Sequence, residues 1–211
     1  MALEALKRNG HNLHIGEFEP EGKYGVPSLC PVRLSKRIDW LPFNCAKTDK
    51  RRSAHGIHFF VDDYLFERVW NDPARYALLL SDFRAVMTPD FSLFTDYPLP
   101  VQIYNHWRKH FLGAYWQSRG ITVLPSICWS DEASFDWCFD GEPVGSTVAV
   151  SSVGTQKNPE ARKLFALGYG EMLRRLKPEK IIFFGDVPEG CEGNLERHSA
   201  YHADLPHARQ R

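Results

Sequence analysis

The feature that most constrains the fold is a set of short apolar segments, rich in β-branched and aromatic residues, that end in turn-forming residues. Five of them recur at intervals of roughly 25–35 residues, the length of a βαβ unit. They span residues 57–61, 85–87, 121–124, 147–150 and 180–184. Continuous apolar runs bounded by turn residues are typical of strands that are buried on both faces. The pattern therefore predicts a core of parallel strands.

Helices are expected between these strands, because proline and capping residues precede apolar residues at helical spacing. Asp72-Pro73 and Asn158-Pro159 each combine an N-cap residue with a proline at the first helical position, and Pro100 opens a third helical segment. This order predicts an α/β fold with a mainly parallel sheet of about five βα units. The sheet is expected to be either open or a partial, TIM-like barrel.

The two ends of the chain lack this periodicity. Residues 1–56 are interrupted by glycine, proline and charged residues, so we expect an irregular N-terminal segment that wraps an α/β core at residues 57–186. Residues 187–211 are rich in glycine, glutamate and arginine and show little core pattern. This last segment is predicted to be a mobile C-terminal tail.

Composition narrows the class of protein. The 211 residues carry 26 basic and 26 acidic side chains, so the net charge is zero; this excludes a strongly basic nucleic-acid-binding coat but leaves a local basic patch open. No apolar run approaches the roughly 18–20 residues that cross a bilayer, and the first residues lack a secretory signal pattern. The five cysteines are widely spaced and predict reduced thiols. We therefore expect a cytoplasmic protein without a membrane partner.

Acidic residues follow the first two predicted strands, and ligands bind at the C-terminal ends of strands in both architectures. Asp62, Asp63, Asp90 and Asp96 are candidate catalytic residues, because clustered carboxylates can divide into a general acid and a general base. Asp62, Asp63 and Asp90 could also hold Mg²⁺ or Mn²⁺ through oxygen ligands. The alternative is structural: Asp62 or Asp63 caps the next helix, and Asp90 orders a turn.

The segment after the fourth predicted strand is a candidate anion site. Ser151, Ser152, Gly154 and Thr155 lie between a strand and a helix. Backbone N–H groups and hydroxyls in that position can bind a phosphate. Because the segment matches neither G-x-G-x-x-G nor the P-loop, the alternative is an ordinary loop with Asn158 as the N-cap of the next helix.

Further candidate residues lie elsewhere on the chain. Trp129, after the third strand, could stack on a base or a sugar, and Ser92 is a ligand-binding candidate beside the acidic residues. His106 and His110 have the i, i+4 spacing that places two imidazoles on one face of a helix. For this pair we expect a helix-surface position or a hydrogen-bonded place in the core.

Several segments, taken in order, resemble a known family. They are residues 59–64, 88–94, 120–125 with Trp129, 148–151 and 181–185. They resemble the domain-of-unknown-function family 4417, whose members are carried by bacteria and their phages, and the resemblance covers about residues 57–186. It implies a phage or mobile-element setting and, for a phage-encoded chain, the cytoplasm of the host cell. It implies no reaction, so no residue inherits a catalytic role from it.

Two classes of function fit these observations. The first is an enzyme that acts on a small phosphate-bearing or nucleotide-like ligand with its strand-end carboxylates. The second is a non-catalytic protein that docks on a host protein, or on nucleic acid through Lys50, Arg51 and Arg52. Binding that survives neutralisation of the aspartates would favour the second class.

Overall fold

The computed structural model describes residues 10–199, whose longer strands form two parallel sheets. The first sheet contains, in spatial order, β3 (Asp39–Pro42), β4 (His55–His58), β5 (Ala85–Met87) and β6 (Val123–Leu124). The second contains β7 (Thr147–Ser151), β8 (Lys180–Phe184) and β9 (Leu195–His198). A parallel bridge between Ser126 and Ala149 links the two sheets. A separate antiparallel pair consists of β1 (Pro20–Glu21) and β2 (Val26–Pro27).

Helices follow the strands where proline and capping residues predict them. The α-helices are α2 (Asp63–Phe66), α3 (Arg68–Asn71), α4 (Pro73–Leu80), α5 (Leu99–Ser118) and α6 (Pro159–Leu176). The 3₁₀ turns are η1 (Phe43–Cys45), η2 (Arg52–Ala54) and η3 (Glu132–Asp136). The Asp72 side chain accepts a hydrogen bond from the backbone of Arg75, and Asn158 accepts one from Ala161. Both expected N-caps are confirmed, at the starts of α4 and α6.

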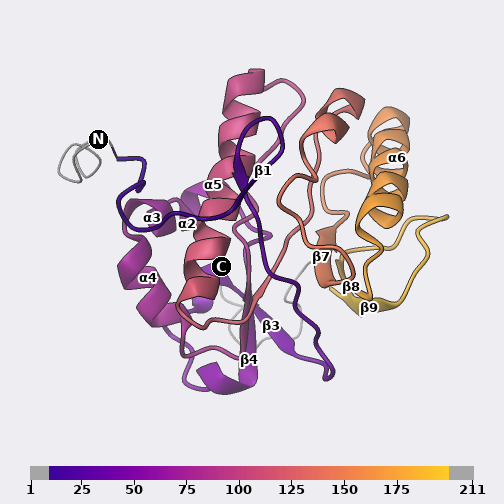
Figure 1. Ribbon diagram of the computed structural model, residues 1–211. Helices are drawn as coiled ribbons and strands as arrows, with labels where there is room; N and C mark the ends of the chain where they lie inside the picture. Colours follow the sequence, from indigo (N-terminus) through magenta and orange to yellow (C-terminus); the bar gives the residue numbers. More distant parts are fainter. Residues whose placement is uncertain (1–9, 200–211) are drawn as a thin grey trace.

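The helices cover one face of each sheet. Ile57 and Val86 of the first sheet belong to a core cluster with residues of α4 and α5, such as Leu112. Val148 and Phe183 of the second sheet pack in another cluster with residues of α6. Figure 1 shows α4 and α5 beside the first sheet and α6 beside the second. Strands that are apolar on both faces are therefore covered by helices on one side, as the sequence pattern requires.

The opposite faces of the two sheets share an apolar interior. Met87 and Leu124 of the first sheet lie in one cluster with Ile182 of the second. Beyond the strand ends, the rings of Phe60 and Phe184 are 4.9 Å apart between centroids. The chain therefore brings the C-terminal ends of β4 and β8 into contact, although these strands belong to different sheets.

The fold is α/β with parallel strands, as expected, but the sheets are small and are not closed. Within residues 10–199, β3 is an edge strand of the first sheet and β9 is an edge strand of the second. These two strands do not pair with each other. The segment before β3 contacts β9 through the Arg37 side chain, which donates a hydrogen bond of 3.1 Å from Nη2 to the carbonyl oxygen of Arg197. The expectation of a TIM-like barrel is therefore not supported.

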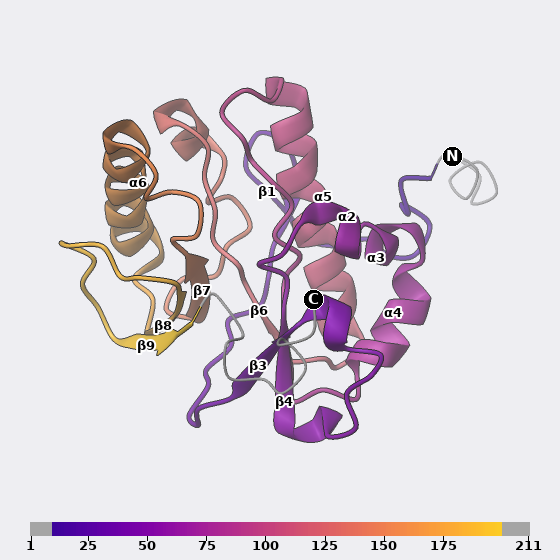
Figure 2. The same cartoon turned by 180° about the vertical axis from the view of Figure 1, so that it is seen from behind.

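Two strands of the parallel sheets lie entirely outside residues 57–186. β3 lies within the predicted N-terminal wrap, and β9 lies within the predicted tail. Neither was found from periodicity, because both are four residues long and carry charged side chains. Figure 2 shows β9 on the side of the molecule opposite the start of the described chain. The remainder of the predicted tail, residues 200–211, lies outside the described residues.

Candidate functional site at the strand ends

A cavity of about 80 Å³ lies at the C-terminal ends of the parallel strands. Asp90 comes from the segment after β5, Trp129 from the segment after β6, and Ser151 and Thr155 from the end of β7 and the loop that follows it. Its other lining residues are Phe60, Ile127, Cys128 and Phe165. Four of the residues singled out from the sequence are thus brought around one cavity, as the convergence of parallel strand ends predicts.

The carboxyl group of Asp90 is the most unusual group in this cavity. Its Oδ1 atom is shielded from solvent and has no hydrogen-bond partner. Burial raises the pKa of Asp90 to about 6, which the ammonium of Lys109 opposes and the nearby Asp63 carboxylate reinforces. The Cys128 thiol also opposes the rise through a hydrogen bond. Asp90 therefore exchanges its proton close to neutral pH, which an ordinary aspartate does not do.

The thiol of Cys128 lines the same cavity but is a poor nucleophile. Burial raises its pKa well above the usual value, and the carboxylates of Asp90 and Glu142 add to the rise, while Lys109 opposes it. Because the thiolate is the reactive form of cysteine, Cys128 remains a neutral hydrogen-bond donor at neutral pH.

The other candidate aspartates do not line the cavity. Asp62 and Asp96 are exposed, and the Asp62 side chain makes no capping hydrogen bond at α2. Asp63 accepts hydrogen bonds from the backbone N–H and the hydroxyl of Ser92, at 3.0 and 2.8 Å. Asp63 and Ser92 therefore tie α2 to the segment after β5. Asp90 is the one carboxylate among the described residues around the cavity.

The loop after β7 is held by hydrogen bonds within the loop and to the segment after β8. The buried Ser152 hydroxyl donates to the carbonyl oxygen of Asp186 at 2.6 Å, and the Thr155 hydroxyl donates to the carbonyl oxygen of Ser152 at 2.8 Å. Gly154 is exposed, and its φ of +81° explains why glycine occupies this turn. Ser152 and Gly154 shape the loop, whereas Ser151 and Thr155 reach the cavity.

Trp129 forms a wall of the cavity and rests on α6. Its ring lies 5.3 Å from the ring of Phe165 between centroids. A Cβ atom at Gly168 would lie only 2.2 Å from Nε1 of Trp129, so the indole can occupy this place only because residue 168 has no side chain. The position of Trp129 therefore depends on the absence of a side chain at one turn of α6.

Gly168→Ala is expected to displace Trp129, because the added methyl group overpacks this part of the core. Overpacking destabilises the protein by about 1–3 kcal/mol, and the better helix propensity of alanine offsets about 1 kcal/mol of that loss. Gly170→Ala is the matched control on the same helix, because nothing lies within 4 Å of its added Cβ. The control should keep or gain stability. Urea denaturation of both variants checks the difference, and equal stabilities would contradict this account of Trp129.

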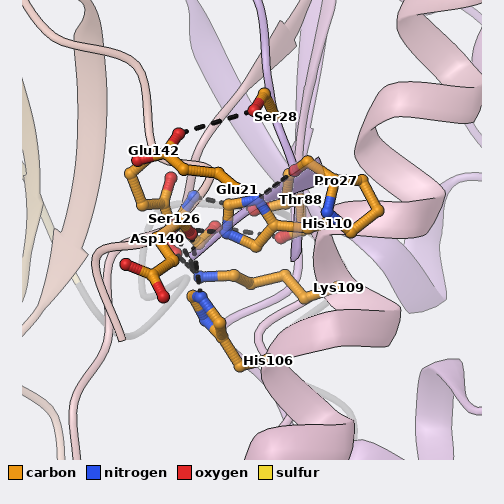
Figure 3. Close-up of polar contacts among 10 residues, drawn as sticks. All are labelled: Glu21, Pro27, Ser28, Thr88, His106, Lys109, His110, Ser126, Asp140 and Glu142. Atoms are coloured by element: carbon orange, nitrogen blue, oxygen red, sulfur yellow. Dashed lines mark hydrogen bonds and ion pairs between the residues drawn. The ribbon is translucent and has the colours of Figure 1, made fainter. Parts of the chain in front are cut away.

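A buried polar network lies next to the cavity (Figure 3). Lys109 of α5 donates from Nζ to the carbonyl oxygen of Ser126 at 2.9 Å and to Oε1 of Glu142 at 2.7 Å. His110 contacts the same Oε1 atom through Nε2 at 3.0 Å and the carbonyl oxygen of Pro27 through Nδ1 at 3.0 Å. The Lys109 ammonium thus links this network electrostatically to Asp90.

Sequence reasoning placed the two histidines but missed Lys109 and Glu142. His106 and His110 are both buried and hydrogen-bonded, so the core alternative is confirmed and the surface alternative is wrong. The spacing of His106 and His110 was a usable signal, and Lys109 lies within it. Glu142 carried no signal, because it lies outside the helices and strands and meets α5 only in the folded chain.

A larger cavity of about 500 Å³ lies elsewhere, between the segments around residues 95–102 and 131–137. Two of its polar groups are engaged within the chain: Asp131 accepts a hydrogen bond from the backbone of Ser134, and Gln102 donates one to the carbonyl oxygen of Tyr97. None of its lining residues has a buried polar atom that lacks a partner. The cavity at Asp90 is therefore the stronger candidate, despite its smaller volume.

The fold and the site together define a class: a mixed α/β protein with parallel sheets and a small cavity at the strand ends. The chain belongs to the family described as Domain of unknown function (DUF4417), whose model matches residues 18–202. The resemblance noted from the sequence is therefore confirmed, and it extends beyond residues 57–186 at both ends.

Relatives of the chain occur in phages. It is 38% identical over 177 residues to the "Gene 1 protein" of Mycobacterium phage L5. This matched segment covers 81% of this chain and 75% of the relative. It is 39% identical over 191 residues to the "Gene 1 protein" of Mycobacterium phage D29. This matched segment covers 87% of this chain and 68% of the relative. No solved structure matches the chain. Within residues 10–199, no helix is long and apolar enough to cross a membrane.

Proposed function

We propose that the chain binds a small phosphate-bearing or nucleotide-like ligand at the strand-end cavity, and that Asp90 exchanges a proton with this ligand. The observation that carries the proposal is the shielded Oδ1 atom of Asp90, which lacks a hydrogen-bond partner. A buried polar atom without a partner costs about 1–3 kcal/mol. A donor group on the ligand would remove that penalty.

The pKa of Asp90 supports acid–base use of this carboxyl group. At about 6, it leaves both protonation forms populated near neutral pH. A general acid or base works best when its pKa lies near the working pH. A group that only orders a turn gains nothing from such a pKa, so the environment of Asp90 favours chemistry at this position.

The remaining walls of the cavity favour a flat ligand group with polar edges. Three aromatic side chains line it, together with the hydroxyls of Ser151 and Thr155. Aromatic faces stack on nucleobases, the Ser151 hydroxyl can donate at a base edge, and the Thr155 oxygen can accept there although its proton is engaged with Ser152. The volume of about 80 Å³ is below the roughly 300–1,000 Å³ of pockets that enclose a drug-sized ligand. We therefore assign the cavity to one part of the ligand, the base.

The phosphate of the ligand would remain outside the cavity, because an ionised Asp90 repels an anion at short range. The exposed Lys157, between the cavity loop and α6, supplies a positive charge for it. Asp90 is the one carboxylate among the described lining residues, so Mg²⁺ or Mn²⁺ enters this proposal bound to the phosphate and not to a cluster of aspartates.

Isothermal titration calorimetry with the four nucleoside monophosphates, with and without Mg²⁺, tests the proposal. We expect one of them to bind, and Asp90→Asn to weaken that binding by at least about tenfold, the effect of losing a hydrogen bond to a charged group. Asp186→Asn is the control, because Asp186 is exposed at the end of β8. The proposal fails if folded wild-type protein binds no nucleotide, or if both variants bind equally well.

The alternative of a docking protein receives weaker support. Of the basic residues proposed for nucleic acid, Arg52 pairs with Asp82 at 2.8 Å and Arg51 contacts the ring of His55 at 3.4 Å. Both side chains therefore already have partners within the chain. Docking on nucleic acid remains a prediction, and it requires an affinity that falls steeply as salt is added.

A further inference from the structure

Three side chains with metal-ligating atoms converge beneath the strand ends. His106 and His110 project from successive turns of α5, and Glu142 approaches from the segment after η3 (Figure 3). Each of the three offers one ligand atom, and these atoms all lie within 4.8 Å of one another. The three residues are 1%, 0% and 5% exposed, respectively. The cluster thus lies in the interior and is not part of a solvated charged surface.

The outer nitrogen of each histidine is fixed by the backbone. Nε2 of His106 donates to the carbonyl oxygen of Asp140 at 3.0 Å, and Nδ1 of His110 donates to the carbonyl oxygen of Pro27 at 3.0 Å. A carbonyl oxygen can only accept, so these two nitrogens carry protons. The other nitrogens make no backbone contact: Nδ1 of His106 has no hydrogen-bond partner, and Nε2 of His110 lies 3.0 Å from Oε1 of Glu142. Metal-bound histidines are oriented by this same kind of backbone contact.

Two atoms of the cluster lack partners. Nδ1 of His106 and Oε2 of Glu142 are both buried and make no hydrogen bond. Because Nε2 of His106 donates to the backbone, the neutral imidazole leaves its Nδ1 atom as an acceptor. Each such buried atom carries a desolvation penalty of about 1–3 kcal/mol. A single cation bound by both atoms would remove both penalties.

We propose that His106, His110 and Glu142 bind a divalent transition metal, with Zn²⁺ as the ion to test. Two imidazoles and one carboxylate form a donor set that zinc accepts in a tetrahedral site with a fourth, open position. Harder ions such as Mg²⁺ prefer an all-oxygen set. The proposal is independent of nucleotide binding at Asp90, because none of the three ligands lines that cavity.

The metal must replace an existing contact in order to enter. Nε2 of His110 lies 3.0 Å from Oε1 of Glu142 in the metal-free protein. Binding forms a metal–nitrogen bond at Nε2, and any proton held there passes to the buffer. Lys109 keeps its contact with Oε1 of Glu142 while Oε2 binds the metal. The nearby ammonium lowers the affinity, so Lys109→Met should raise the affinity for Zn²⁺.

The test is the metal content of the purified protein, followed by cobalt substitution. Wild-type protein from zinc-supplemented cells should carry about one zinc ion per chain by mass spectrometry. Metal-free protein should develop the intense visible bands of tetrahedral cobalt when Co²⁺ is added. His106→Gln should lose both signals, since the amide can still donate to the carbonyl of Asp140 but is a poor metal ligand. His198→Gln, at a histidine bonded to Glu196, is the control and should keep both.

A wild-type protein that contains no zinc, and that gives only the weak spectrum of hydrated cobalt, would overturn the proposal. In that case the Lys109 ammonium would be the cation that balances the Glu142 carboxylate, without a metal ion. Loss of metal in His198→Gln to the same extent as in His106→Gln would also overturn it. If His106→Gln does not fold, the cobalt spectrum of the wild-type protein decides alone. Binding of nucleotides is measured separately and has no influence on these results.

Discussion

Glu142→Gln is expected to lower the free energy of unfolding by about 3–5 kcal/mol, the usual effect of removing one partner from a buried ion pair. Lys109 and Glu142 are 1% and 0% exposed in their side chains and lie 2.7 Å apart. The carboxylate of Glu142 also accepts a hydrogen bond from the buried ring of His110. With a neutral amide at position 142, the buried Lys109 ammonium would lose its hydrogen-bonded counter-charge. Urea denaturation at neutral pH, with a metal chelator present, measures the loss.

Glu171→Gln is the matched control for this prediction. Glu171 pairs with Arg174 at 2.7 Å and with Arg175 at 2.8 Å, but on the surface of α6. Surface ion pairs contribute about 0–1 kcal/mol, so this variant should stay within that range. Adding Lys109→Met to Glu142→Gln should restore part of the lost stability, because it removes one uncompensated charge. A Glu142→Gln variant as stable as the Glu171→Gln control would show that the buried pair contributes little.

The sequence predicted the elements of the fold because their signals are local. The apolar runs that end near Asp90 and Ser151 identify strands from burial alone, and Asn158-Pro159 identifies the start of α6 from cap chemistry. Parallel strands place their C-terminal ends at one edge, so the common location of Asp90, Trp129 and Thr155 also followed from local patterns. These predictions needed no knowledge of contacts between distant residues.

The parts that sequence reasoning missed depend on such distant contacts. Asp63 binds Ser92, 29 residues away, and Glu142 binds Lys109, 33 residues away. A carboxylate that caps, one that holds a distant backbone and one that neutralises a buried lysine have the same sequence appearance. The packing of the two sheets against each other is equally invisible, because it joins distant side chains such as Met87 and Ile182 in one interior cluster.

The polar interior explains why Asp90 differs from its neighbours. Asp63 accepts two hydrogen bonds from Ser92, and Oε1 of Glu142 lies within hydrogen-bond distance of a lysine and a histidine. Asp90 faces the same Lys109 ammonium only at longer range, and its Oδ1 atom has no partner. The single lysine is therefore committed to Glu142, and the carboxyl group at the cavity is left with an incompletely compensated charge.

Asp90→Asn is therefore expected to stabilise the protein by about 1–3 kcal/mol at neutral pH. An aspartate with a pKa near 3.8 in the unfolded chain and about 6 in the folded protein favours unfolding once it ionises. The penalty is negligible below about pH 4, grows between about pH 4 and 6, and is complete above that range. The raised pKa sets its upper limit at about 3 kcal/mol. The variant should therefore match the wild-type protein near pH 4 and exceed it at pH 7.

Urea denaturation of both proteins across this pH range measures the effect, with Asp96→Asn as the control at an exposed aspartate. The control should follow the wild-type curve at every pH. An Asp90→Asn variant that is less stable than the wild-type protein at pH 7 would assign Asp90 to the architecture of the turn. A variant that is more stable but binds nucleotide less well would show that the chain sacrifices stability to keep an ionisable group at this cavity, a trade-off typical of functional sites.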